Sequence, residues 1–302
     1  MARVEQIFDN VNVCSYYQIG GCSFKVCGEE LSNAIEKLCG FHTFKADSTQ
    51  TPDFTVSMPL GFKIPETQKI LYTSETDGVT FYFYSIGNNA HLLELEHGSG
   101  SKLYAWNNPD AKQIYLKGVL LPQMLRFALW VAYGLMTMGL RRIAIHGSCI
   151  VKDNRAYLFL GESGTGKSTH TRLWRENIPG AELLNDDSPI VAADIEDGKI
   201  WIYGSPWSGK TPCYKQERYR LCGCVRLSQA PENIMTKLPK LKAYAALHPS
   251  CPPEFAYDDF LYDMLGKTIN DILLQVPFYH LKCLPNPEAA QLSYNTLAEN
   301  GE

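Results

Sequence analysis

The chain has 302 residues, of which 45% are hydrophobic and 20% charged, with a formal net charge of −4 and a pI near 6.0. This composition is close to the globular average, so it supports a large buried core and excludes global disorder. The slightly acidic balance gives no electrostatic reason to expect nucleic acid or an anionic membrane as a partner. The first ten residues lack the apolar stretch of a signal peptide, so we expect a cytoplasmic protein with free thiols at its ten cysteines.

Residues 1–112 have the pattern of a β-rich α+β region. Short apolar runs at 80–85, 91–96 and 102–106 are separated by turns that contain Gly and Asn or Ser, which favours a β-meander. Residues 29–38 have the spacing of a short amphipathic helix. No group of reactive side chains stands out in this region, and we assign it no chemical role.

Residues 116–140 form an apolar run that is long enough to suggest a membrane span. Lys117 and Arg126 lie inside it, and a charge near the middle of a bilayer is costly. We therefore predict a buried core helix that begins at Pro122 and ends at Gly139, and no membrane partner.

From residue 113 the sequence has the pattern of an α/β domain. Predicted strands at 143–151 and 155–160 precede a glycine-rich loop, a helix and a further strand at 182–184. This order of strand, helix and strand predicts a βαβ unit in a parallel or mixed sheet. We divide the chain into a β-rich region, 1–112, and an α/β domain, 113–302.

The glycine-rich loop, residues 161–169 (GESGTGKST), matches the Walker A or P-loop pattern G-x-x-x-x-G-K-[ST]. Its glycines allow backbone N–H groups to turn toward phosphate oxygens, and the following helix adds its positive dipole end. Lys167 can reach the β- and γ-phosphates, and the Ser168 hydroxyl can ligate Mg²⁺. We expect ATP and Mg²⁺ to bind here. The predicted nucleotide-binding residues of the loop are Gly161, Ser163, Gly164, Thr165, Gly166, Lys167, Ser168 and Thr169.

Asp186 and Asp187 follow a short apolar strand about twenty residues after the loop lysine. Residues just past the end of a strand in a parallel sheet lie beside a neighbouring P-loop. One carboxylate there can hold Mg²⁺, and the other can accept the proton of an attacking hydroxyl. The alternative is a solvated turn, because Asn-Asp-Asp-Ser-Pro is also a good turn sequence.

Two further features could contribute to the same site. His146 lies on a predicted strand next to the P-loop strand, although an isolated histidine is more often a satisfied core residue. A shaped loop at 204–212 contains Trp207, which could wall a pocket, and Lys210, which could bind a phosphate or an acidic acceptor. A surface loop with an exposed lysine explains that spacing equally well.

Residues 117–250 resemble the catalytic domain of HPr kinase/phosphorylase, a family related in fold to phosphoenolpyruvate carboxykinase. The resemblance rests on three stretches in the family's order: His-Gly at 146–147, GESGTGKST at 161–169, and LNDDSPIV at 184–191. It implies an α/β fold with the mixed sheet of the HPr kinase and phosphoenolpyruvate carboxykinase type, preceded here by the β-rich α+β region.

The resemblance also implies roles for individual residues. Asp186 matches the family's base for the acceptor hydroxyl, Asp187 matches its metal-binding partner, and His146 matches the histidine that sets the state of the base. Lys167 and Ser168 would bind phosphates and Mg²⁺. Self-association is implied too, since HPr kinases form rings.

The chain departs from the family after the aspartates. GSPWSGKTPCY stands where HPr kinases have a glycine-rich Glu-Ile-Arg-Gly segment tied to phosphorolysis, so that activity is not carried over. We expect an ATP-dependent kinase that phosphorylates a hydroxyl, first of all a serine, of a protein, peptide or small metabolite. The alternatives are a nucleotide-binding regulatory module with little catalysis and a carboxykinase-like enzyme of small molecules.

Overall fold

The computed structural model describes residues 13–48, 51–193, 197–209 and 211–299. The chain divides into two compact units, which we describe separately. The first comprises Met1–Gln18 and Cys22–Met136, and the second comprises Ile19–Gly21 and Thr137–Glu302. The contacts therefore divide the chain at 136/137, and not at the predicted 112/113, because the apolar helix after residue 121 packs on the first sheet.

The first unit is built on an eight-stranded sheet in the order β1-β2-β3-β8-β7-β6-β5-β4. Strands β4 to β8 form an antiparallel meander, and β3 pairs in parallel with both β2 and β8. The meander predicted from residues 80–106 is thus present. The strands are β1 (Cys14–Ile19), β2 (Cys22–Cys27), β3 (Phe54–Ser57), β4 (Lys69–Thr76), β5 (Val79–Gly87), β6 (Ala90–His97), β7 (Lys102–Asn108) and β8 (Gln113–Gly118).

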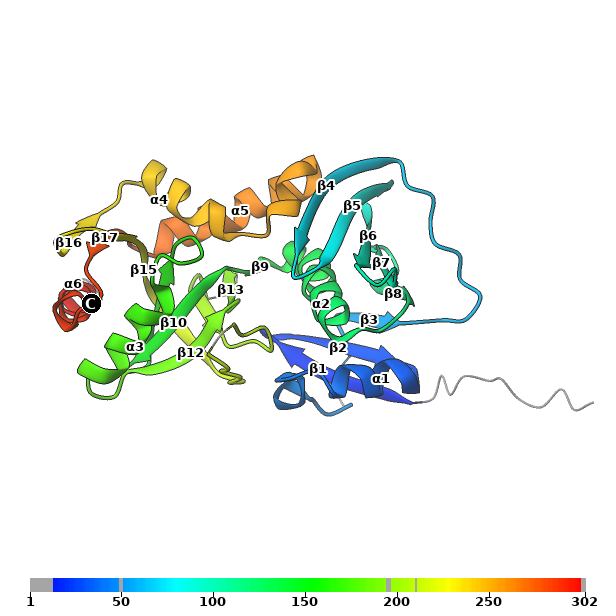
Figure 1. The fold of residues 1–302 in the computed structure, drawn as a ribbon, viewed down its shortest axis with the longest axis horizontal. Helices are drawn as coiled ribbons and strands as arrows, with labels where there is room; N and C mark the ends of the chain where they lie inside the picture. The colour runs from blue at the N-terminus through cyan, green and yellow to red at the C-terminus, as the bar shows by residue number, and fades with distance from the viewer. Residues whose placement is uncertain (1–12, 49–50, 194–196, 210, 300–302) are drawn as a thin grey trace, which may run out of the picture. The chain divides into compact units, whose positions relative to one another are not determined.

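Two α-helices accompany this sheet, α1 (Glu29–Glu36) and α2 (Pro122–Thr137). Figure 1 shows α2 alongside the strands of the meander, and the Phe127 ring lies 4.9 Å from that of Phe81. A short 3₁₀ turn, Met138–Leu140, ends the helix. The predicted core helix is confirmed. Among the helices of the described residues, none is both long enough and apolar enough to cross a bilayer.

The second unit contains a nine-stranded mixed sheet whose main path is β12-β10-β11-β15-β14-β13-β9. The first part of the long strand β15 pairs with β14, and its last part pairs in parallel with β17, which also pairs with β16. The strands are β9 (Arg142–Ala144), β10 (Gly147–Lys152), β11 (Arg155–Leu160), β12 (Glu182–Asp187), β13 (Ile190–Ala193), β14 (Ile200–Tyr203), β15 (Arg218–Gln229), β16 (Ile234–Lys237) and β17 (Phe278–Cys283).

The strand, helix and strand predicted around the P-loop are β11, α3 (Lys167–Asn177) and β12. They form a crossover, but β11 and β12 are not neighbours, because β10 lies between them and runs antiparallel to both. Strand β11, which leads into the P-loop, and strand β12, which carries the paired aspartates, therefore run in the same direction, with β10 between them. This arrangement brings the carboxyl ends of β11 and β12 to the same edge of the sheet.

Helices cover both faces of this sheet. Trp174 of α3 is fully buried, its ring lies 5.4 Å from that of Phe159, and its indole N–H donates to Ser293 Oγ of α6 (Pro287–Glu299) at 2.8 Å. The other two helices, α4 (Lys240–Leu247) and α5 (Asp259–Gln275), lie along the opposite side (Figure 1). The core of the unit therefore holds α3, and with it the P-loop, in place against the sheet.

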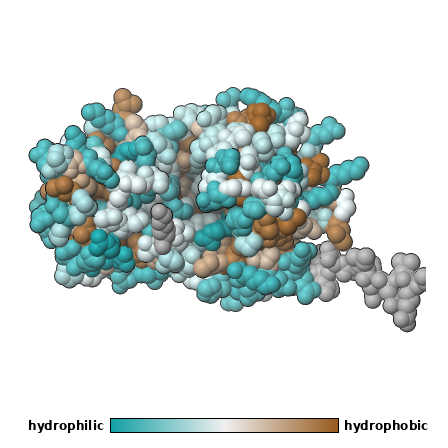
Figure 2. Space-filling model, in the orientation of Figure 1, coloured by the Kyte–Doolittle hydropathy of each residue, from teal (hydrophilic) through white to brown (hydrophobic). Residues whose placement is uncertain are grey.

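The surface of the molecule is of mixed polarity on the face shown in Figure 2. Hydrophilic residues are spread across that face, and hydrophobic residues appear between them in separate small groups. Single exposed apolar residues are normal on a folded protein, since apolar atoms supply more than half of its surface.

One buried carboxyl group should make the stability of the fold depend on pH. Glu254 is 1% exposed, its burial raises its pKa to about 7, and its Oε1 has no hydrogen-bond partner among the described residues. The folded state therefore holds the proton more tightly than the unfolded chain, whose pKa is 4.5. The free energy of unfolding should fall as pH rises from 4.5 to about 7, and it should then level off.

We expect Glu254→Gln to remove this pH dependence. In urea denaturation, the wild type should lose on the order of 3 kcal/mol of unfolding free energy between the two pKa values, and the variant much less. The comparison uses the slope of the unfolding free energy against pH. The cost of burying the glutamine amide shifts the whole curve of the variant and leaves its slope unchanged. A variant with the wild-type slope would contradict this assignment.

Candidate functional site

The P-loop connects β11 to α3 and bends at three glycines. Gly161, Gly164 and Gly166 have φ angles of 154°, 82° and 100°, values that L-residues with a side chain rarely adopt. Thr165 closes the loop, because its backbone N–H and its hydroxyl both donate to the Glu162 carbonyl, at 3.2 and 2.8 Å. Helix α3 begins at Lys167, within the 161–169 motif, so its first N–H groups and its dipole point to the space that the loop surrounds.

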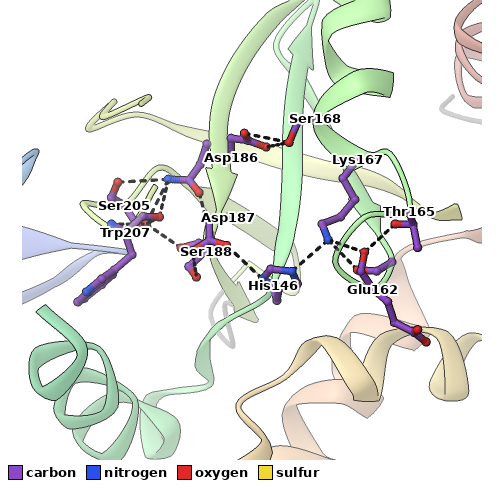
Figure 3. Close-up of polar contacts among 12 residues, drawn as sticks. His146, Glu162, Thr165, Lys167, Ser168, Asp186, Asp187, Ser188, Ser205 and Trp207 are labelled. Atoms are coloured by element: carbon purple, nitrogen blue, oxygen red, sulfur yellow. Dashed lines mark hydrogen bonds and ion pairs between the residues drawn. The ribbon is translucent and has the colours of Figure 1, made fainter. Parts of the chain in front are cut away.

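The second residue of α3, Ser168, contacts the first of the paired aspartates. Its hydroxyl lies 3.1 and 3.2 Å from the two carboxylate oxygens of Asp186, which is 5% exposed (Figure 3). Asp186 pairs with Ser148 across β10 and β12, and the Ser148 hydroxyl donates to Thr171 of the same helix. Asp186 therefore lies on the face of the sheet that α3 covers.

Asp187 points to the opposite face of the sheet, and an irregularity in β12 determines which of the two aspartates faces α3. The residues of β10 that pair with Leu183 and Asn185 are consecutive, so Leu184 is an extra residue in β12, a β-bulge. Side chains alternate along a strand, and the bulge shifts that alternation by one residue. Without the bulge, Asp187 instead of Asp186 would face α3.

His146 lies between Asp187 and Lys167, just before the start of β10 (Figure 3). Its Nδ1 is 3.2 Å from Asp187 Oδ1, and its Nε2 is 3.0 Å from Lys167 Nζ. The ammonium group is a donor only, so Nε2 accepts from it and Nδ1 carries the proton that is donated to Asp187. A backbone bond from His146 N–H to the Ser250 carbonyl at 2.7 Å holds the residue in this position.

Lys167 is the positively charged group in the series of contacts from Asp187 through His146. Its ammonium group also donates to the Gly161 carbonyl at 2.7 Å. Burial lowers the pKa of Lys167, and the charge of Arg226 lowers it further, while Asp187 and Asp186 raise it. The lysine is therefore influenced by both positive and negative groups.

The structure brings together His146, Lys167, Ser168, Asp186 and Asp187, which the sequence placed in one site. The family resemblance gave the metal-ligand role to Asp187 together with Ser168, whereas the aspartate that contacts Ser168 is Asp186, because of the bulge in β12. Among the described residues no group of three or more His, Cys, Asp or Glu side chains could hold a metal ion by itself.

Asn185 is fully buried and attaches the loop at 204–212 to this site. Its amide nitrogen donates to the carbonyls of Ser205 and Trp207 at 3.2 and 3.3 Å, and its oxygen accepts from the Ser188 N–H at 2.9 Å. The N–H of Gly209 donates to the Asp186 carbonyl. Trp207 is itself buried, and Lys210 lies outside the described residues.

We expect Asn185→Ala to loosen this loop and to destabilise the second unit. The substitution leaves the buried carbonyls of Ser205 and Trp207 and the N–H of Ser188 without this partner. The free energy of unfolding should fall by about 2–3 kcal/mol. Denaturation measures that loss, and hydrogen exchange should report faster exchange at 204–212. Unchanged exchange there would show that the loop is held by other contacts.

A pocket of about 650 Å³ opens beside the P-loop, between the start of α3 and the end of β17. The pocket could not be predicted from the sequence, because it depends on β17, which lies more than a hundred residues after the loop. Its lining combines backbone groups, polar side chains and apolar carbon. The lining residues are Gly164, Thr165, Gly166, Thr169, His170, Leu173, Gln229, Ala230, Cys283, Leu284 and Pro285.

Two side chains of β15 also contact the P-loop and were missed from the sequence. Arg226 pairs with Leu160, the residue before the loop, and its guanidinium lies 3.2 Å from the Glu162 carboxylate. Gln229 donates to the Gly164 carbonyl at 3.2 Å. The sequence shows only that Arg226 lies within an apolar run. Its position beside the loop depends on the parallel pairing of β15 with β11.

Comparisons with known proteins give little further guidance. No protein-family model matches the chain, and the curated proteins contain no match. Among solved structures, the Hpr(Ser) kinase/phosphatase from Coxiella burnetii matches over 52% of this chain and 88% of its own, at 13% identity and a TM-score of 0.31. At those values the match is a distant structural resemblance and does not define this protein's activity.

Proposed function

We propose that this protein is a kinase that transfers the terminal phosphoryl group of a nucleoside triphosphate, ATP in the first place, to a hydroxyl group. The observation that carries the proposal is the arrangement around the start of α3. A glycine-rich loop and a lysine suited to phosphates are flanked by one carboxylate at Ser168 and a second at His146. Phosphoryl transfer requires this combination of anion binding, metal ligands and a proton acceptor.

A bound nucleotide would contact the loop through its phosphates and fill the adjoining pocket with its nucleoside. The phosphates would lie against the loop amides and the first turn of α3, where the helix dipole favours negative charge. The pocket of about 650 Å³ adjoins Gly164, Gly166 and Thr169, so it would take the nucleoside. A mixed polar and apolar lining suits a base and a sugar, which combine flat apolar faces with hydrogen-bonding edges.

Ser168 and Asp186 fit Mg²⁺. Both offer oxygen, which this ion prefers, and it is held in such enzymes by one or two protein groups together with substrate phosphates. Ser168 Oγ and the nearer Asp186 oxygen are 3.1 Å apart, so the two groups would both reach one bound ion. When bound, the ion would neutralise charge on the phosphate oxygens.

Asp187 is the better base of the two aspartates. Its side chain is 38% exposed, so an acceptor can approach it, whereas Asp186 is buried beneath α3. The acceptor oxygen forms a bond to the terminal phosphorus as its proton passes to Asp187. The bond to the bridging oxygen breaks, and the nucleoside diphosphate leaves. His146 orients Asp187 through the hydrogen bond from Nδ1 and is a positioning residue.

Transfer of labelled phosphate tests the proposal. The purified protein is incubated with ATP labelled in the terminal phosphate, Mg²⁺, and in separate reactions serine-containing peptides, free serine and other hydroxylated metabolites, and protein extract. Label in an acceptor that depends on Mg²⁺ supports a kinase and identifies the acceptor class. Tight ATP binding with no transfer in any reaction would support a nucleotide-binding regulatory module instead.

A further inference from the structure

Arg226 and Glu162 form an ion pair at the mouth of the P-loop. Arg226 Nη2 lies 3.2 Å from Glu162 Oε1, and Nη1 donates to the Ala246 carbonyl of α4, also at 3.2 Å. The two partners differ in exposure, because the arginine side chain is 24% exposed and the glutamate side chain 81%. The arginine is thus held by the fold, whereas the carboxylate reaches back to it from solvent.

The position of Arg226 follows from the sheet. It lies opposite Leu160 in the parallel pairing of β11 and β15, directly beside the point where the chain enters the loop. Its charge lowers the pKa of Lys167, although burial is the larger cause. The two cations are therefore within electrostatic reach of each other. Glu162, whose carbonyl accepts from Lys167 at 3.3 Å, belongs to the same loop.

We propose that Arg226 is a second phosphate-binding cation of this site and that Glu162 occupies its guanidinium until the nucleotide arrives. The inference rests on the proposed function, since it assigns Arg226 to the same phosphates. A polyphosphate carries more charge than one carboxylate and matches the planar fork of a guanidinium. An ion pair with a partner so exposed is weak, so the phosphate can displace it at little cost. Glu162 then turns to solvent, and Arg226 joins Lys167 in binding phosphate oxygens.

Opposite effects of the two single substitutions distinguish this exchange from a fixed structural ion pair. Glu162→Gln removes the competing carboxylate, so it should tighten Mg²⁺·ATP binding by about threefold, within the range of an exposed ion pair. Arg226→Gln removes the phosphate ligand and should weaken binding by about tenfold or more. In the double variant, the gain from Glu162→Gln should be smaller than in the wild type, because no guanidinium remains to be released.

Calorimetric titration of the full chain with Mg²⁺·ATP measures these affinities, and thermal unfolding of each variant shows that it is folded. Weaker binding in both single variants, or no change in Arg226→Gln, would overturn the proposal. If Arg226→Gln does not fold, Glu162→Gln alone tests the role of Arg226, and an unchanged or weaker affinity for Mg²⁺·ATP overturns that role.

Lys167→Ala in the same titration distinguishes failure of the proposed function from failure of the role of Arg226. If ATP does not bind the wild type or binds independently of Lys167, the proposed function has failed, whereas Lys167-dependent binding with the wrong signs rejects the role of Arg226 only.

Discussion

Replacing Lys167 with alanine is expected to reduce phosphoryl transfer by about a thousandfold or more, because the loop lysine supplies the charge that offsets the terminal phosphate in the transition state. The ammonium group contacts the Gly161 carbonyl and His146 Nε2, and Lys167 is not a member of the buried apolar cluster around Trp174. The fold should therefore survive. Transfer of labelled phosphate, followed alongside thermal unfolding, measures both parts of the prediction.

Lys167→Arg is the matched control for charge. It keeps a cation but not the compact ammonium that fits between His146 Nε2 and the loop carbonyls, so we expect most of the transfer rate to be lost here too. A variant without any cation at 167 that retains the wild-type rate would show that the loop does not bind the reacting phosphate.

The second large effect is expected at Asp187. Asp187→Asn keeps the shape of the side chain and can still accept a hydrogen bond from His146 Nδ1, but its amide cannot take up the acceptor proton. The rate of transfer should fall by about 10²–10⁴-fold, the usual contribution of a general base, with the affinity for Mg²⁺·ATP nearly unchanged. Titration and single-turnover transfer measure the two quantities separately.

Asp186→Asn is the informative comparison. Because Asp186 contacts Ser168, this variant should need a Mg²⁺ concentration at least about tenfold higher for half-maximal nucleotide binding. The family resemblance gives the opposite roles, with Asp186 as base and Asp187 as metal ligand. If Asp186→Asn binds Mg²⁺·ATP normally and loses transfer, while Asp187→Asn loses Mg²⁺ dependence, those roles are correct and the assignment from the contacts is wrong.

The residues of the site could be predicted from the sequence because they lie in short segments with strong local patterns. The P-loop glycines are required by their positive φ angles, and the aspartates are the last two residues of β12, which ends at the same edge of the sheet as β11. The orientation of the aspartates could not be predicted. It depends on one extra residue, Leu184, whose bulge is defined only by pairing with β10.

Long-range pairing explains what else the sequence missed. Arg226 reaches the loop because β15 pairs in parallel with β11, and the pocket beside the P-loop needs the end of β17. The boundary between the two units moved for a similar reason. Helix α2 precedes the α/β segment in sequence, but its apolar side chains, Phe127 among them, pack on the strands of the first sheet.

The most direct measurement is a crystal structure of the protein with Mg²⁺ and a non-hydrolysable ATP analogue. We predict that the terminal phosphate lies at the start of α3 within hydrogen-bonding distance of Lys167, that the ion touches Ser168, and that Asp187 faces the open side of that phosphate. An analogue bound away from the P-loop, or a terminal phosphate out of reach of both aspartates, would contradict phosphoryl transfer at this site.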